Sequence, residues 1–428
     1  MAPVGALTMN AVRQLLFVAA AFALTALTAA PSAHAQETPA AGAELASEDE
    51  LVQFALTHNL ELRAAHWDQD IAAAGVTSAS ALNNPVARGE WLHVQSPANY
   101  GFGVGVEWAP PQPGVYGAVT DAARAQARAV KADFSERSAD LEANVRRSYA
   151  QIAALSEEIA LAEKSIETRH SVHQAVKDRL QHGASSRIDL SLAAVSLARG
   201  EQERDLLLLA RATEITQLEV LVGLPPGQSL SLTARLETSN ATLEQRPASE
   251  RPQLQADAAR TSAADLTLSA ERAKRWPWLA LQARYRRHDQ STYPNDVTLG
   301  LELTLPIFNQ NPGPIAAAEA SRHALRDVAA AHRVSIERDI RVLRAETARR
   351  RSIAEHYSQS IAPVLTEHAA LVKQALAGME LDLTALLAAE DMVTRSGIEY
   401  MEARLAQRKT EILLARALGE YGRASRSK

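Results

Sequence analysis

The chain has 428 residues, with 45 basic and 50 acidic side chains, a formal net charge of −5 and no cysteine. The net charge is mildly negative, so the chain lacks the excess of basic side chains that is typical of nucleic-acid binding, and no nucleic-acid partner is expected. The lack of cysteine excludes structural disulfides and thiolate metal sites.

The first 35 residues have the pattern of a secretory signal peptide. Arg13 supplies a positive charge, an apolar run from Leu15 to Ala30 follows, and Ala33-His34-Ala35 gives a small-residue cleavage site. A retained signal anchor is the alternative, which the proline and small residues at the end of the run disfavour. Beyond this segment we find no run of about 18 apolar residues, the length of a spanning helix. The mature chain is therefore expected to be periplasmic, secreted or an outer-membrane barrel.

The rest of the sequence is organised as two similar halves. Gly105 and Gly300 stand 195 residues apart, and so do Gly183 and Gly378. An ordered series of matches at nearly one offset indicates a duplication. We place the first repeat at residues 36–247 and the second at residues 248–428. Each repeat is expected to contain a helix, two strands and two long helices.

Long helices are the strongest local signal. The residues from 118 to 182 include no glycine or proline, and such a helix would reach roughly 100 Å. Apolar residues recur at mixed three- and four-residue steps, which favours coiled-coil packing. A soluble coiled-coil protein is the alternative that helices alone do not exclude. The expected helices are Ser47–Leu82, Ala118–His182, Ala184–Val222, Arg251–Trp276, Ile315–Ala362 and Met379–Leu418, with a kink at Pro363.

Four short segments have the alternation of β-strands. They are Val86–Gln95, Tyr100–Trp108, Trp278–His288 and Val297–Leu305. In the second and fourth, apolar side chains alternate with glycine or polar residues over nine positions, and a tilted membrane strand needs about 9–11 residues. The pattern favours one lipid face and one lumen face, although a half-buried soluble hairpin alternates in the same way. Four strands cannot close a barrel of about eight or more, so membrane strands would require several protomers.

Several motifs occur in the same order as in a known family. They are Asn83-Asn84-Pro85, Gly183-Ala-Ser-Ser-Arg-Ile-Asp189, Arg251-Pro252-Gln253-Leu254, and the stretch from Leu299 to Ile315 with its Leu-Pro-x-Phe and Asn-x-Asn-x-Gly patterns. On these residues the chain resembles the TolC family of outer-membrane efflux and secretion factors. The last motif is similar to the heavy-metal, CzcC-type branch of that family.

The resemblance implies a mainly α fold with a small β part, made of duplicated long helical hairpins and two β-hairpins. It implies a homotrimer, in which three sets of four strands give a 12-stranded outer-membrane barrel over an α-helical periplasmic tunnel. It also implies a periplasmic adaptor, an inner-membrane RND transporter and outer-membrane lipid as partners. No cofactor and no chemistry of its own are implied.

The resemblance also directs attention to the ends of the helical hairpins, which face the adaptor in the family. The expected tip residues are Gly183, Ala184, Ser185, Gly378 and Met379, where a glycine also permits a left-handed turn. Family members often carry acids below the second tip, but the matching positions lie near Ala385 and Ala388. Asp189 and Asp382 are the remaining aperture candidates, and a solvated coiled-coil face is the more ordinary role for both.

The function expected from the sequence is an outer-membrane channel subunit that exports heavy-metal cations such as cobalt, zinc or cadmium. The alternative within this fold is a duct for drugs or secreted proteins, and a soluble periplasmic coiled-coil adaptor is the alternative from another class. An enzyme is not expected, since no Gly-rich phosphate loop, nucleophile elbow or His-Glu-x-x-His motif occurs. His170 and His173 alone are a weak metal signal, so no catalytic, cofactor-binding or metal-binding residue is assigned.

Overall fold

The fold was analysed in a computed structural model of the chain. The structure describes residues 47–95, 98–237, 251–288, 295–378 and 383–421. All of these residues belong to one compact unit, Glu44–Lys428. The predicted signal peptide, residues 1–35, lies outside the described residues, as does the predicted boundary between the two repeats at residue 247. Both of these assignments therefore stay predictions.

The first described helical region consists of two helices, α2 (Glu48–His58) and α3 (Leu60–Ala79). The prediction of one helix over Ser47–Leu82 is wrong, because the chain breaks at Asn59. The Asn59 side chain accepts the Leu62 backbone N–H at 2.8 Å and donates to the Leu221 carbonyl at 2.7 Å. An asparagine that caps a new helix in this way competes with helix continuation.

The strands form one antiparallel sheet in the order β1-β2-β3-β4. Their bounds are Val86–Gln95 for β1, Ala98–Trp108 for β2, Trp278–His288 for β3 and Asp296–Thr304 for β4. The four predicted strands are confirmed, with shifts of one or two residues at the ends of β2 and β4. The central β2–β3 pairing joins the two halves of the sequence, so neither half builds this sheet alone.

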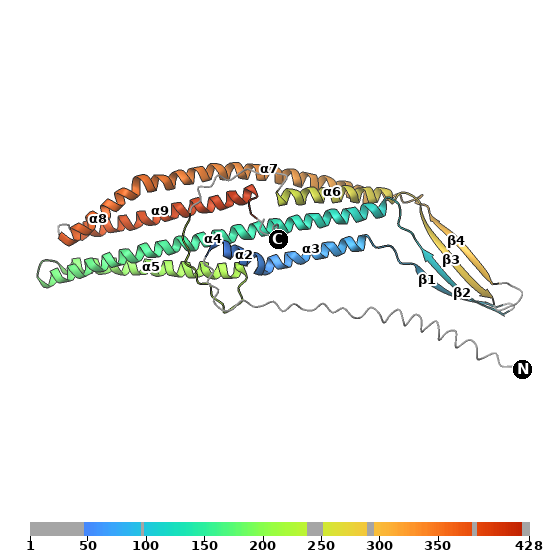
Figure 1. The fold of residues 1–428 in the computed structure, drawn as a ribbon, viewed down its shortest axis with the longest axis horizontal. Helices are drawn as coiled ribbons and strands as arrows, with labels where there is room; N and C mark the ends of the chain where they lie inside the picture. Colours follow the sequence, from blue (N-terminus) through green and yellow to red (C-terminus); the bar gives the residue numbers. More distant parts are fainter. Residues whose placement is uncertain (1–46, 96–97, 238–250, 289–294, 379–382, 422–428) are drawn as a thin grey trace, which may run out of the picture. The chain divides into compact units, whose positions relative to one another are not determined.

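Long helices make up most of the described chain (Figure 1). The first half continues through α4 (Val115–Gln181) and α5 (Arg187–Val222), and the second half opens with α6 (Pro252–Ala273). After β4 follow α7 (Pro312–His356), the π-helix η2 (Tyr357–Ile361), α8 (Ala362–Gly378) and α9 (Leu383–Leu418). The longest helix, α4, packs against α3, α5, α6 and α9. Among the described residues, no helix combines the length and the apolar character that a membrane span needs.

Pro363 does not end its helix. The backbone N–H of Ala362 bonds to the Tyr357 carbonyl five residues back, which forms η2 immediately before the proline. Proline has no N–H and its ring clashes with an α-helical turn. A wider π-turn absorbs both effects, because it shifts the bonding pattern by one residue. The expected kink is thus a local π-helix, and α8 continues to Gly378.

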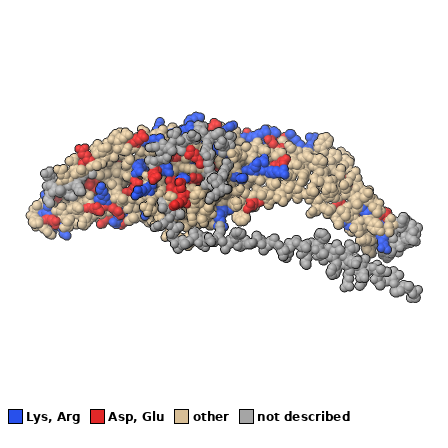
Figure 2. All heavy atoms as spheres, viewed as in Figure 1, with Lys and Arg blue, Asp and Glu red and all other residues tan. Residues whose placement is uncertain are grey.

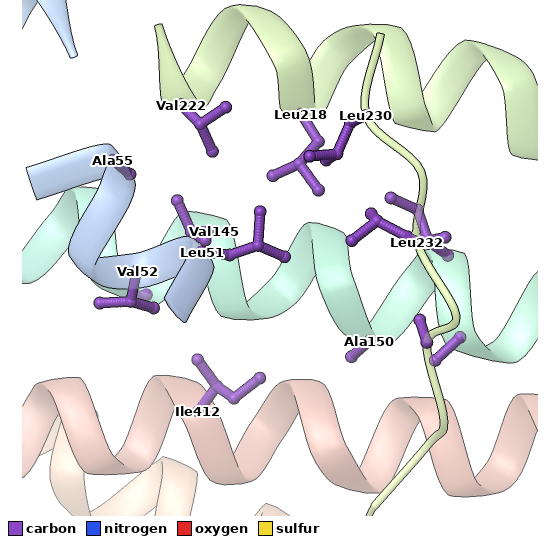
Figure 3. Close-up of a cluster of buried hydrophobic side chains, with 14 of the residues drawn as sticks. Leu51, Val52, Ala55, Val145, Ala150, Leu218, Val222, Leu230, Leu232 and Ile412 are labelled. Carbon is purple, nitrogen blue, oxygen red and sulfur yellow. The ribbon is translucent and has the colours of Figure 1, made fainter. Parts of the chain in front are cut away.

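The main hydrophobic core lies where four helices meet (Figure 3). It includes Leu51 of α2, Val145 of α4, Leu218 of α5 and Ile412 of α9, all almost fully buried. Burying a side chain of this size contributes about 1.5–3 kcal/mol. The core therefore ties both ends of the described chain to the middle of α4.

An extended segment after α5 closes one side of this core. Leu230, Leu232, Ala234 and Leu236 are buried in it, and the residues between them are exposed. No strand of the described chain pairs with the segment. Carboxylates of helical residues replace such a partner, since Glu219 accepts the Leu230 N–H at 2.9 Å. The segment is thus held by side chains rather than by a sheet ladder.

Charged side chains of both signs are intermixed over the helices (Figure 2). Some of them join the two halves of the chain. Arg408 of α9 donates to Glu48 of α2 at 2.9 Å, and Arg404 of α9 donates to Glu157 of α4 at 2.7 Å. These pairs are partly buried, so they are screened less by salt than surface pairs are.

Candidate functional site

One face of the four-stranded sheet is apolar and exposed. Residues directly opposite each other in the register share a face, and this face carries Phe102, Val104 and Val106 of β2, Leu279, Leu281 and Tyr285 of β3, and Val297, Leu299, Leu301 and Leu303 of β4. Leu299 is 80% exposed and Leu301 is 65% exposed. A contiguous exposed apolar surface of this kind marks a protein or membrane contact.

The other face of the sheet is polar and internally paired. Arg88 lies 2.8 Å from Glu107 across β1 and β2, and Arg284 lies 3.4 Å from Glu90. Gln282 donates to the Glu302 carboxylate at 2.7 Å. The predicted alternation between an apolar face and a small or polar face is therefore present in the sheet. Such an arrangement suits a wall between hydrocarbon and an aqueous lumen.

Glycines on the polar face leave space for the charged side chains. A Cβ added at Gly103 would lie 3.3 Å from the Arg286 Cγ and 3.6 Å from the Glu90 Cβ. A larger residue would therefore have to displace the neighbouring arginine or glutamate. This close approach explains why β2 alternates glycine with large apolar residues.

The end of the first helical hairpin is a compact turn. Gly183 has a φ of +77°, a left-handed conformation that favours glycine. The Ala184 N–H bonds to the Arg179 carbonyl at 2.8 Å, which closes α4 as a Schellman-type cap does. Gly183, Ala184 and Ser185 thus lie together at the hairpin end, as expected. Their contact with an adaptor stays a prediction.

Asp189 lies in the first turn of α5, next to this tip. Its carboxylate accepts the Ser186 backbone N–H at 2.9 Å and the Ser185 hydroxyl at 3.0 Å. The hydrogen bonds from Ser186 and Ser185 lower the pKa of Asp189, so it carries its charge over a wide pH range. Asp189 therefore has a capping role in the protomer, and its role at an aperture stays a prediction.

The second hairpin end is only partly within the described chain. Gly378 is the last residue of α8, which is consistent with a turn directly after it. Met379 and Asp382 lie outside the described residues. The aperture role of Asp382 and the tip role of Met379 therefore stay predictions.

A buried arginine links the two helical hairpins, which the sequence did not indicate. Arg169 of α4 donates to the carbonyl and hydroxyl of Ser196 on α5 at 3.0 and 3.2 Å. It also lies 3.4 Å from Asp391 of α9. Beside it, Thr394 donates to Ser165 at 3.0 Å. This small polar network joins α4, α5 and α9 near the hairpin ends.

Two glutamates in the contact between α4 and α9 have perturbed acidity. Burial and the facing carboxylate of Glu402 raise the pKa of Glu158 to about 7. Burial also raises the pKa of Glu390, although a hydrogen bond from Ser165 opposes this shift. Both carboxylates hold their protons more tightly than exposed glutamates do. The contact between the two hairpins is thus sensitive to pH.

Metal ligands do not cluster in the described parts of the chain. No group of three or more His, Asp or Glu side chains within 47–95, 98–237, 251–288, 295–378 and 383–421 is arranged to hold an ion. The features that stand out are instead a two-faced sheet and a helical region with two long hairpins.

Comparison with known proteins identifies this combination. Residues 51–224 match the family model described as "Outer membrane efflux protein". The chain is thus similar to this family over residues 51–224, which is less than half of its length. The chain is also 26% identical over 237 residues to the cobalt-zinc-cadmium resistance protein CzcC of Cupriavidus metallidurans, a match that covers 52% of this chain and 54% of CzcC. The matched region thus spans about half the length of this curated relative.

Solved outer-membrane channels share the fold of this chain. The open-state channel MtrE of Neisseria gonorrhoeae has a TM-score of 0.74 at 20% identity, over 87% of this chain and 88% of MtrE. OprN has a TM-score of 0.75 at 17% identity, over 87% and 89% of the two chains. CusC has a TM-score of 0.73 at 17% identity, over 91% and 96%. The predicted fold class is confirmed.

The matched family model also bears on the predicted location and chemistry. The description of the matched family model agrees with the predicted location in the outer membrane. The matched model describes efflux proteins rather than enzymes, which agrees with the expectation of a non-enzymatic chain. The heavy-metal branch is a finer assignment that the distant CzcC match only suggests.

Proposed function

We propose that the chain is the outer-membrane duct of a tripartite efflux system and that three copies form the channel. The two-faced sheet carries this proposal. Its apolar face suits lipid and its polar face suits a water-filled lumen. An isolated sheet of four strands would leave β1 and β4 with open edges, which hydrocarbon does not tolerate. Pairing of β4 with β1 of the next copy removes these edges.

In this proposal the long helices continue the duct across the periplasm. The residues near Gly183 and Gly378 would meet a periplasmic adaptor, and an inner-membrane RND transporter would supply the energy. The chain itself performs no chemical step. The polar pairs on the lumen face of the sheet keep that surface wettable without a strong net charge, which suits a passive exit path.

The proposed cargo is heavy-metal cations such as cobalt, zinc or cadmium. Two observations favour this cargo over organic drugs or secreted proteins. The name of the relative CzcC states cobalt-zinc-cadmium resistance, and the Asn309-Gln310-Asn311 turn is similar to the heavy-metal branch. A soluble periplasmic adaptor is disfavoured, because an adaptor would bury the apolar sheet face that is exposed here.

A growth assay tests the cargo. Cells that lack the gene are challenged separately with cobalt, zinc, cadmium and hydrophobic drugs, and the wild-type gene is returned on a plasmid as the control. We expect the deletion to sensitise cells to at least one metal and the plasmid to restore resistance. Sensitivity to the drugs alone would contradict the metal cargo but would keep the duct.

The channel itself is tested by extraction and electrophoresis. We expect the mature protein to require detergent for extraction and to migrate as an oligomer that heating converts to monomer. A monomer that stays in aqueous buffer without detergent would contradict the channel proposal.

A further inference from the structure

The connection between β4 and α7 carries an unusual set of exposed apolar side chains. Leu305 is 52% exposed, Ile307 is 67% exposed and Phe308 is fully exposed. Trp276, which precedes the neighbouring strand β3, is 73% exposed at the same end of the sheet. Several large apolar side chains exposed together in this way mark a candidate contact surface.

The turn that carries Phe308 is fixed by local contacts. The Ile307 N–H bonds to the Leu305 carbonyl at 2.9 Å, a tight turn around Pro306. Asn311 adopts a left-handed conformation with a φ of 63°. Its side chain donates to the Glu271 carboxylate at 2.7 Å and to the Glu271 carbonyl at 3.0 Å. The exposed side chains are therefore presented by a turn that is anchored to α6.

The corresponding connection in the first half is different. Between β2 and α4, Gln112 donates to the Trp276 carbonyl at 3.1 Å, and Trp108 donates to the Asn83 carbonyl at 3.0 Å. The residues after Trp108 are half-buried rather than exposed up to Gln112. The strand-to-helix connection of the first repeat thus lacks the exposed large apolar side chains that follow β4 in the second repeat.

The length of β4 gives a reason for the extra apolar residues. A strand of nine residues that rises about 3.3 Å per residue and tilts by about 45° covers only about 21 Å of membrane. The apolar band of an outer-membrane strand is about 25 Å tall. Leu305 and Ile307 follow directly after β4, so their exposed side chains add apolar surface beyond the end of the strand.

We propose that Leu305, Ile307 and Phe308 form an anchor in the periplasmic leaflet of the outer membrane, with Phe308 at the boundary between acyl chains and phospholipid headgroups. The proposal rests on the proposed membrane role of the sheet. Lipid is the occupant that the structure favours, because the three exposed apolar side chains follow the apolar strand β4 with no charged residue between them and the strand. The bond between Asn311 and Glu271 holds the anchor at a fixed height relative to the helices.

Site-directed spin labelling tests the anchor. The chain has no cysteine, so Phe308→Cys gives a single labelling site in the full-length protein. Gln310→Cys, two residues further on in the same turn and exposed, is the matched control. Leu301→Cys on the apolar sheet face is the reference for lipid. Each labelled protein is reconstituted in phospholipid vesicles, and collisions with oxygen and with a water-soluble nickel chelate are measured.

We expect the label at position 308 to collide often with oxygen and rarely with the nickel chelate. The ratio of oxygen collisions to nickel collisions should be severalfold higher at position 308 than at position 310. Nickel access at 308 equal to that at 310 would overturn the anchor. A label at 308 that is immobile and shielded from both reagents would also overturn it, because a second copy of the chain would then cover Phe308. Nickel access at position 301 would overturn the membrane role of the sheet and the anchor together.

A second variant tests the role of the turn. Asn311→Gly keeps the left-handed backbone but removes the bonds to Glu271, and it is combined with Phe308→Cys. We expect a more mobile label with a broader range of depths. An unchanged spectrum would show that the bond to Glu271 does not position the anchor.

Discussion

Replacing Glu158 by glutamine is expected to stabilise the helical region at neutral and alkaline pH. Glu158 is only 7% exposed and makes no hydrogen bond or ion pair to a described residue. Burial and the facing Glu402 raise the pKa of Glu158 from 4.5 to about 7. The folded protein thus holds a proton on this carboxyl between these two pH values, whereas the unfolded protein releases it.

The sign of the effect follows from this difference. The free energy of unfolding falls as pH rises from about 4.5 to 7, and the penalty is complete above that range. A shift of this size corresponds to at most about 3.5 kcal/mol, since one pKa unit is about 1.4 kcal/mol. Glu158→Gln removes the penalty, so it should match the wild-type protein at pH 4 and exceed its stability at pH 8.

The assay is thermal unfolding of the detergent-solubilised protein by circular dichroism between pH 4 and pH 8. Glu163→Gln, an exposed position on the same helix, is the matched control and should leave the pH profile unchanged. A constant difference in Tm between Glu158→Gln and the wild-type protein across this pH range would refute the reasoning.

Three further substitutions test the packing. Gly397→Val should lower the Tm, because an added Cβ would lie 2.5 Å from the Leu161 Cδ2 and overpacking costs about 1–3 kcal/mol. Gly75→Ala, where an added Cβ meets nothing within 4 Å, should not lower the Tm, and equal losses at both positions would contradict this packing. Asn59→Ala removes a cap and an inter-helix hydrogen bond, which should cost about 1–3 kcal/mol in urea unfolding, and an unchanged midpoint would show that neither bond matters. Arg169→Met keeps an unbranched apolar stem but removes the guanidinium group and its bonds, so hydrogen exchange in α9 should become faster. Unchanged exchange would contradict the link between the hairpins.

Much of the fold was predictable because it depends on local patterns. The four strands follow from alternation at period two, which the chain shows most clearly in β2 and β4. The long helices follow from runs without glycine or proline. The duplication stays a prediction. Gly200 and Gly397 stand 197 residues apart, close to the offset of 195 residues that indicated it, and the structure gives a physical reason for both glycines. Added side chains at these glycines would crowd Arg169 and Leu161, respectively.

Other features could not be predicted from the sequence, because they depend on which helices pack against each other. Arg169 and Glu158 resemble the many solvated charges on a helix, and only the docking of α9 on α4 buries them. The break at Asn59 had a local signal, since asparagine is a good helix cap. The second hydrogen bond of its side chain, however, goes to the carbonyl of Leu221, which is far away in the sequence. The π-helix before Pro363 depends on how the helix absorbs a missing N–H, which the sequence pattern does not specify.

The central claim is that one face of the sheet meets lipid and the other meets water. Leu281 and Gln282 are consecutive residues of β3 on opposite faces, so Leu281→Arg and Gln282→Arg add the same charge in the two environments. An arginine in the lipid-facing midplane costs about 2–4 kcal/mol, whereas one on the polar face lies beside Glu302. We expect Leu281→Arg to reduce the amount of heat-modifiable oligomer in the outer-membrane fraction and Gln282→Arg to leave it near the wild-type amount. Equal amounts of oligomer in the two variants would contradict the claim.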